Sequence, residues 1–142
     1  MKKQVYRSFA TFLLLSVIWA APSLYAQSSR LMTFKIPFHF NIGKTSLPAG
    51  DYTVQPLSQT ALLIRSDDCR SSAIVLTISA QTSQAREKGT LVFNQYGNRY
   101  FLSKVWHPAN NLGRELLPSK LERELAQNMS KPQATILTAQ KR

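Results

Sequence analysis

The sequence has little of the chemistry that most enzymes and metalloproteins require. Its 142 residues include one cysteine and two histidines, and seven acidic residues stand against eighteen basic ones. A single cysteine excludes an intramolecular disulfide, and the histidines are not spaced as zinc ligands. Neither a Gly-x-Ser-x-Gly nucleophile motif nor a phosphate-binding glycine loop is present. The sequence therefore predicts no catalytic residue, no cofactor and no metal site.

Two side chains remain as candidates for catalysis, Cys69 and His107. Cys69 lies in the polar stretch "RSDDCRSS", where the neighbouring Asp67 and Asp68 oppose formation of a thiolate. His107 precedes a proline and has no carboxylate at a spacing typical of a catalytic pair. A hydrolase built on either residue is the least favoured of the functions considered.

The first 26 residues have the pattern of a secretory signal peptide. Three basic residues and no acidic one precede an apolar stretch at residues 9–21, which Pro22 ends, and Ala26 is a small residue suited to the cleavage position. The alternative is a membrane anchor, but this stretch is shorter than the roughly 20 residues that a spanning helix needs. We expect cleavage after Ala26, no transmembrane span afterwards, and a periplasmic or extracellular location.

The remaining chain, residues 27–142, has the length of one domain. Loss of residues 1–26 removes three basic residues, so the formal charge of +11 becomes +8. The basic residues are spread along the chain instead of concentrating in one stretch with interleaved aromatics. This pattern predicts a soluble basic surface with a general attraction to anionic envelope components, and no specific nucleic-acid binding.

The segment "FKIPFHFNIGKTSLPAGDYTV" shows the clearest periodicity. From two residues before this segment, apolar residues occupy every second position as far as residue 42, which is typical of a half-buried strand: Met32, Phe34, Ile36, Phe38, Phe40 and Ile42. Pro37 cannot donate a ladder hydrogen bond, so we expect a sheet edge or a bulge there. "LPAG" then predicts a turn into a second strand.

Further strands are predicted at residues 60–65 and 72–79, both apolar on two faces and therefore expected at the centre of a two-layer packing. A polar connection, residues 80–89, leads to a hairpin over residues 90–106 around "QYGN". A four-residue loop would pair Phe93 with Tyr100, whereas a two-residue loop would pair Phe93 with Leu102. Both registers are compatible with the sequence.

The C-terminal part contains one helix signal. Ser119 and Glu122 form a capping box, which predicts a short helix to about Gln127. Residues 27–128 are accordingly expected to form one all-β domain with a short C-terminal helix, and residues 129–142 a flexible tail. The domain is expected to be a single antiparallel sandwich or small barrel of six or seven strands.

Three segments together resemble an uncharacterised group of small exported bacterial β proteins. They are "IPFHFNIGKTSLPAGDYTV", "LVFNQYGNRYFLSKVW" and "GRELLPSKLERELA". The group's pattern combines an Ile-Pro-Phe-x-Phe strand, Leu-Pro-Ala-Gly-x-Tyr-x-Val, a Phe-x-x-Tyr-Gly hairpin and a Ser-Lys-x-Glu helix start. The resemblance implies an exported all-β domain, and it brings no activity, cofactor or catalytic residue with it.

These observations favour a non-enzymatic interaction module of the cell envelope or secreted space. Exposed strand edges and aromatic side chains are how small β domains bind partners, so the candidate interaction surface comprises Pro37, His39, Tyr96, Tyr100 and Trp106. The alternative is a small barrel that holds an apolar small molecule inside the stripe of Phe34, Phe38 and Phe40. The default interpretation of that stripe is core packing.

Overall fold

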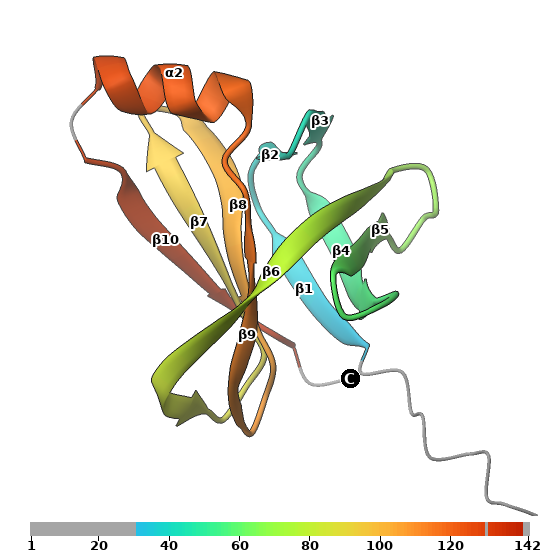
Figure 1. Ribbon diagram of the computed structural model, residues 1–142. Helices are drawn as coiled ribbons and strands as arrows, with labels where there is room; N and C mark the ends of the chain where they lie inside the picture. The colour runs from blue at the N-terminus through green and yellow to red at the C-terminus, as the bar shows by residue number, and fades with distance from the viewer. Residues whose placement is uncertain (1–30, 130, 141–142) are drawn as a thin grey trace, which may run out of the picture.

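A computed structural model describes residues 31–129 and 131–140, so the predicted signal peptide lies outside the described residues. These residues form ten strands and one helix (Figure 1). The elements are β1 (Met32–Ile36), β2 (Phe40–Ile42), β3 (Thr45–Leu47), β4 (Gly50–Pro56), β5 (Ala61–Ser66), β6 (Ser72–Arg86), β7 (Thr90–Tyr96), β8 (Arg99–Trp106), β9 (Asn110–Leu116), α2 (Lys120–Asn128) and β10 (Gln133–Thr138). The all-β character and the short C-terminal helix are confirmed.

The strands form one open sheet that is mixed but largely antiparallel. Its order is β1-β4-β5-β6-β9-β8-β2-β3, with β7 on β8 and β10 on β7. The long strand β6 pairs with β5 through residues 72–76 and with β9 beyond them, so it belongs to both halves of the sheet (Figure 1). Strands that continue from one packed layer into the next make such corners. The sheet does not close, and the barrel alternative is therefore wrong.

The predicted apolar stripe forms the first part of the core. Five of its six side chains are buried and Phe38 is partly buried. The stripe is divided into β1 and β2, because the chain leaves the ladder at residues 37–39, where Pro37 has no N–H to donate. β1 pairs with β4, and the predicted turn lies between Leu47 and Gly50.

Aromatic rings join the two halves of the sheet. The ring of Phe40 meets Tyr52 of β4 edge-on at 5.1 Å and Phe93 of β7 edge-on at 5.6 Å between ring centroids. Such edge-to-face pairs add to the free energy gained by burial alone. Phe34 and Phe40 are fully buried and belong to the hydrophobic core, which agrees with core packing as the default interpretation of the stripe.

The hairpin of β7 and β8 adopts the shorter of the two loops considered. Tyr96 pairs with Arg99 across a two-residue turn, and Phe93 pairs with Leu102. Gly97 has a φ of +60°, a conformation that glycine adopts without strain. The register then shifts between Val92 and Phe93, which is a β-bulge.

Several strands lie outside the prediction, which gave six or seven. Besides the division of the first strand, β3, β9 and β10 are additional in the described chain. Residues 80–86, expected as part of a connection, continue β6. Residues 133–138, expected within a flexible tail, form β10, which pairs with β7 along its whole length. This segment includes the β-branched residues Thr135 and Ile136, and the distant strand β7 supplies its hydrogen-bonding partner.

The predicted helix start is confirmed at Ser119. Its side-chain oxygen accepts a hydrogen bond of 3.2 Å from the backbone N–H of Glu122. The helix α2 then lies across one end of β7, β8 and β10 (Figure 1). In the described part of the chain, no helix is long and apolar enough to span a membrane.

Candidate functional site

The loop between β1 and β2 holds two of the predicted surface residues. Pro37 and His39 are exposed, while Phe38 between them turns inward. The Phe38 ring stacks on Tyr100 of β8 with centroids 3.9 Å apart and planes 15° apart. Tyr100 is therefore half-buried beneath Phe38. The structure brings Pro37, His39 and Tyr100 into one neighbourhood, of which only the first two side chains are fully exposed.

The other two predicted aromatics are buried. Tyr96 is 6% exposed and Trp106 is 5% exposed. Tyr96 meets Phe101 edge-on, and Trp106 is covered on one side by Arg86, whose guanidinium carbon lies 5.5 Å from the ring centroid. The expectation of an exposed aromatic hairpin fails at both positions, because Tyr96 packs on Phe101 and because β9 and the end of β6 cover Trp106.

The turn between β5 and β6 contains Cys69 and Asp68, two residues whose types can indicate reactivity or metal binding. Cys69 has a φ of 57° and is exposed as a free thiol. Asp68 accepts hydrogen bonds from the Ser66 hydroxyl and the Arg70 backbone N–H, and these bonds hold its pKa below the usual value. The carboxylate therefore stabilises the turn. Among the described residues, no group of three or more His, Cys, Asp or Glu side chains could hold a metal ion.

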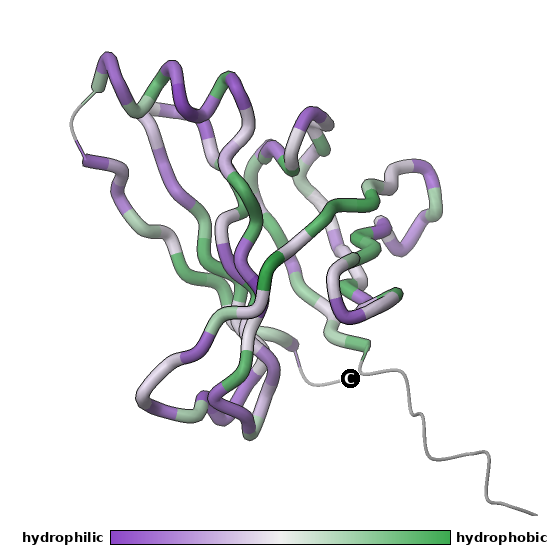
Figure 2. Tube along the Cα trace, in the orientation of Figure 1, coloured by the Kyte–Doolittle hydropathy of each residue, from purple (hydrophilic) through white to green (hydrophobic). Residues whose placement is uncertain are grey.

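The most conspicuous surface feature is a row of large apolar side chains on the outer face of β6. Ile74 is 69% exposed, Leu76 is 70% exposed and Ile78 is 50% exposed. Because they alternate with Ala73, Val75 and Thr77, whose side chains point into the core, all three lie on the same outer face. Figure 2 shows this first part of β6 as a largely hydrophobic segment. We refer to Ile74, Leu76 and Ile78 as the β6 row.

Neighbouring strands extend the β6 row and define its border. Leu63 and Ala61 of β5 lie directly opposite Ile74 and Leu76, and both are half-buried. Opposite Ile78 lies Glu115 of β9, which pairs with Lys104 of β8 at 3.8 Å between Nζ and Oε2. An apolar centre with a charged border is typical of a protein-binding surface.

The prediction missed the β6 row for a physical reason. Residues 72–79 are apolar on both faces, a pattern typical of a strand covered on both sides. No element of the described chain covers the outer face of β6, so one apolar face is left exposed. A strand that is apolar on both faces needs a covering layer on each face. The number of elements predicted from the sequence is too small to form both layers, and this is the signal that could have revealed the exposed row.

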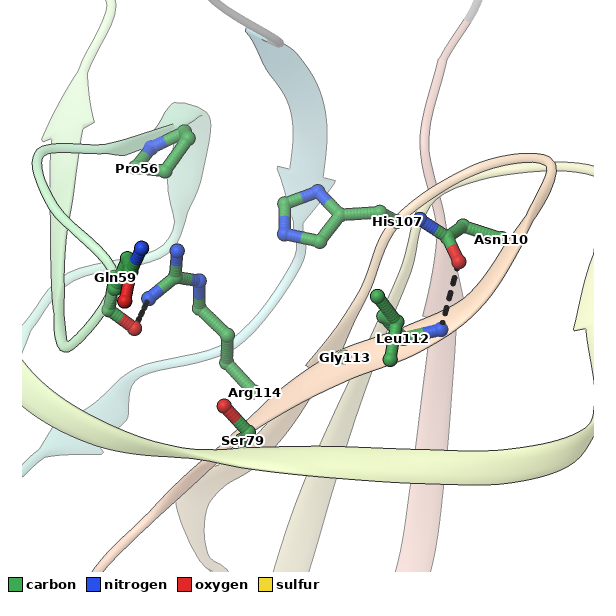
Figure 3. A pocket seen from close by; sticks show the side chains of 8 residues that line it. All are labelled: Pro56, Gln59, Ser79, His107, Asn110, Leu112, Gly113 and Arg114. Atoms are coloured by element: carbon green, nitrogen blue, oxygen red, sulfur yellow. Dashed lines mark hydrogen bonds between the residues drawn. The ribbon is translucent and has the colours of Figure 1, made fainter.

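A second feature is a pocket of about 280 Å³ where the two halves of the sheet diverge (Figure 3). It is lined by Pro56, Gln59, Ser79, His107, Asn110, Leu112, Gly113 and Arg114. We refer to it as the Arg114 pocket. His107, which the sequence offered only as an unsupported catalytic candidate, is 8% exposed and belongs to this pocket. Cys69 lies in a different pocket, so the two candidates do not share a site.

Comparison with known proteins finds no family model, no curated protein and no solved structure that matches the chain.

Proposed function

We propose that the protein is an exported, non-enzymatic interaction module of the cell envelope, and that the β6 row is the centre of its binding surface. The observation that carries the proposal is the exposure of three consecutive outward side chains, Ile74, Leu76 and Ile78, on a central strand. Contiguous apolar surface of this kind marks interaction sites on soluble domains. The signal-peptide pattern of residues 1–26 supports export.

The size of the β6 row indicates what else the partner must supply. Full burial of one such side chain is worth roughly 1.5–3 kcal/mol, so the exposed parts of three give about 3–6 kcal/mol gross. A dissociation constant of 1 μM requires about 8 kcal/mol after the cost of association. Apolar contact alone is therefore too weak, and polar or charged contacts at the border must contribute.

The charge of the chain points to an acidic partner protein. After loss of residues 1–26 the chain carries a formal +8, and exposed Arg65 lies on the same outward face of β5 as Leu63, next to the β6 row. Two positively charged copies repel each other, which disfavours a homodimer through this face, whereas an acidic surface is attracted to it. Pro37 and His39 are a second exposed point at which such a partner could make contact.

The proposal is tested with Leu76→Thr, which removes the apolar centre of the row while keeping β propensity. The matched control is Ile136→Thr on β10, where the isoleucine is 55% exposed. Tagged wild-type protein crosslinked in envelope preparations should capture an acidic protein, in a salt-sensitive manner, and Leu76→Thr should lose it while Ile136→Thr retains it. Equal capture by both variants contradicts the assignment of the surface.

Analytical ultracentrifugation of the purified protein tests the alternative that a second copy of the chain covers the β6 row. We expect wild type and Leu76→Thr to sediment alike as monomers. A wild-type dimer that Leu76→Thr dissociates would show that a second copy covers the β6 row, and the acidic-partner proposal would then be wrong. Cell fractionation tests export separately.

A further inference from the structure

The Arg114 pocket is assembled from four segments that are distant in the sequence. Pro56 and Gln59 come from the end of β4 and the loop after it, Ser79 from β6, and His107 from the segment after β8. The last wall is β9, from Asn110 to Arg114. The pocket therefore exists only in the folded sheet, and its residue positions are fixed by strand pairing rather than by a flexible loop.

Arg114 is held in place at the centre of this pocket. Its Nη1 donates to the backbone carbonyl of Gln59 and, at 3.5 Å, to the hydroxyl of Thr77. A guanidinium has five N–H donors, so these two bonds orient the group and leave donors for a ligand. Figure 3 shows the guanidinium rising from β9 between Gln59 and the side of the pocket occupied by His107.

The charge of Arg114 is not balanced within the described chain. The ion pairs formed by the described residues join Arg70 to Asp68, Lys104 to Glu115 and Lys120 to Glu124, and none includes Arg114. Burial lowers the pKa of Arg114 from its ordinary value, which is the direction expected when a cation loses water without gaining a carboxylate. Arg114 is half-buried, and a partly desolvated cation of this kind is stabilised by an anion.

Other polar groups converge on the same space. Ser79 lies directly opposite Arg114 in the pairing of β6 and β9, on the same face of the sheet. The Asn110 side-chain oxygen accepts a hydrogen bond of 3.0 Å from the Leu112 N–H, which leaves the amide NH₂ on the side of His107 (Figure 3). Serine, asparagine, histidine and arginine can all donate hydrogen bonds to an oxyanion.

The remaining walls are apolar and the space is small. Pro56 and Leu112 border the polar groups, and the volume of about 280 Å³ is near the lower end of small-molecule sites. One guanidinium matches one planar carboxylate in a fork geometry. The lining includes no second arginine and no lysine, so a monoanion fits the charge better than a polyphosphate.

We propose that the Arg114 pocket binds a small organic carboxylate, with the carboxylate on Arg114 and a short apolar portion against Leu112 and Pro56. His107, Ser79 and Asn110 surround the carboxylate as further donors. This site is separate from the β6 row and does not depend on the function proposed for that surface.

The first test uses sodium butyrate, hexanoate and benzoate as probes, and hexanamide as the neutral match for hexanoate. Amide shifts in ¹H–¹⁵N NMR spectra should move saturably at residues 110–114, and hexanamide should bind more weakly by about tenfold or more. Arg114→Gln should weaken carboxylate binding by a similar factor. Arg123→Gln on α2 removes an exposed arginine outside this pocket, and it should leave the affinity unchanged.

A second variant covers the case in which Arg114→Gln does not fold. Leu112 is 44% exposed at the pocket, so Leu112→Glu places a tethered carboxylate beside Arg114 with little effect on the core. It should fold and should abolish saturable binding of the free acids. The proposal is overturned if wild type shows no saturable shift up to about 10 mM acid, if hexanamide binds equally well, or if folded Leu112→Glu binds like wild type.

Discussion

Glu122, in the first turn of α2, accepts a hydrogen bond of 2.9 Å at Oε1 from the Nδ2 amide of Asn94 on β7. Glu122 is 5% exposed, unlike a glutamate on an ordinary helix surface. The sequence assigned Glu122 to helix capping, and its backbone N–H does take part in the cap of Ser119. Its side chain also connects the helix to the sheet through this bond.

We expect Asn94→Ala to destabilise the fold by about 1–3 kcal/mol, because it leaves a buried carboxylate without this donor. Glu122→Gln should cost less, since the amide oxygen can still accept from Asn94. Urea unfolding at neutral pH measures both. Glu124→Gln is the control, because Glu124 is exposed and, among the described residues, forms an ion pair with Lys120 on the helix surface. Equal stability of Asn94→Ala and wild type would show that the contact does not hold the helix.

The apolar stripe gives a graded prediction. Phe40 is fully buried between Tyr52 and Phe93, so Phe40→Ala should cost about 3–5 kcal/mol. Phe38 is only partly buried, although its ring stacks on Tyr100, so Phe38→Ala should cost distinctly less than Phe40→Ala. Thermal unfolding of the two variants side by side measures the difference. If Phe38→Ala costs as much, the loop at residues 37–39 is part of the core.

Local pattern was enough to predict much of the fold. The alternation of residues 32–42, the turn before Gly50 and the cap at Ser119 depend on neighbours within a few residues, and each is confirmed. The strands β9 and β10 depend on partners far along the chain. The composition of β9 is polar and rich in turn formers, so tertiary pairing overrides local preference there, whereas β10 contains strand formers that gain their hydrogen-bonding partner from β7.

The candidate sites were harder to predict for the same reason. Trp106 is buried because β9 approaches it, and Ile74 and Leu76 are exposed because no further layer covers β6. The Arg114 pocket combines four segments, none of which has a motif of its own. Only Pro37 and His39 could be placed on the surface from the sequence, since proline marks a break in the ladder.

The turn between β5 and β6 gives a prediction about pH. The pKa of Asp68 is lowered, first by the hydrogen bond from Ser66 and then by that from the Arg70 N–H. A carboxyl group whose pKa is depressed in the folded state stabilises that state above the unfolded pKa, near 3.9, and loses the contribution as pH falls through the folded value. Because Asp68 is exposed, solvent screening keeps this effect small.

Ser66→Ala should therefore raise the pKa of Asp68 toward that of a free aspartate. A pH titration of the Asp68 carboxyl carbon by NMR, in the wild type and the variant, measures the change directly. An unchanged pKa would mean that the Arg70 N–H, rather than the Ser66 hydroxyl, is the main cause.

Gly113 provides a prediction that connects the fold to the Arg114 pocket. A Cβ at this position would lie 2.7 Å from Cζ3 of Trp106 and 2.8 Å from the carbonyl oxygen of Val105. Because one of these contacts is with a backbone atom, β8 and β9 must separate to relieve the overlap. We therefore expect Gly113→Ala to lower the free energy of unfolding by about 1–3 kcal/mol. At Gly50, by contrast, a Cβ would meet only Tyr52 at an ordinary 3.6 Å, so Gly50→Ala is the matched control and should be close to neutral.

Trp106 is the one tryptophan of residues 27–142, so its fluorescence reports on this contact in the processed chain. Gly113→Ala should shift the emission of the folded protein to longer wavelength, because separation of β8 from β9 admits water to a ring that is 5% exposed in the wild type. It should also weaken carboxylate binding, since Gly113 adjoins Arg114 in the pocket wall. A folded Gly113→Ala variant with wild-type emission and stability would show that β9 does not pack this closely on Trp106.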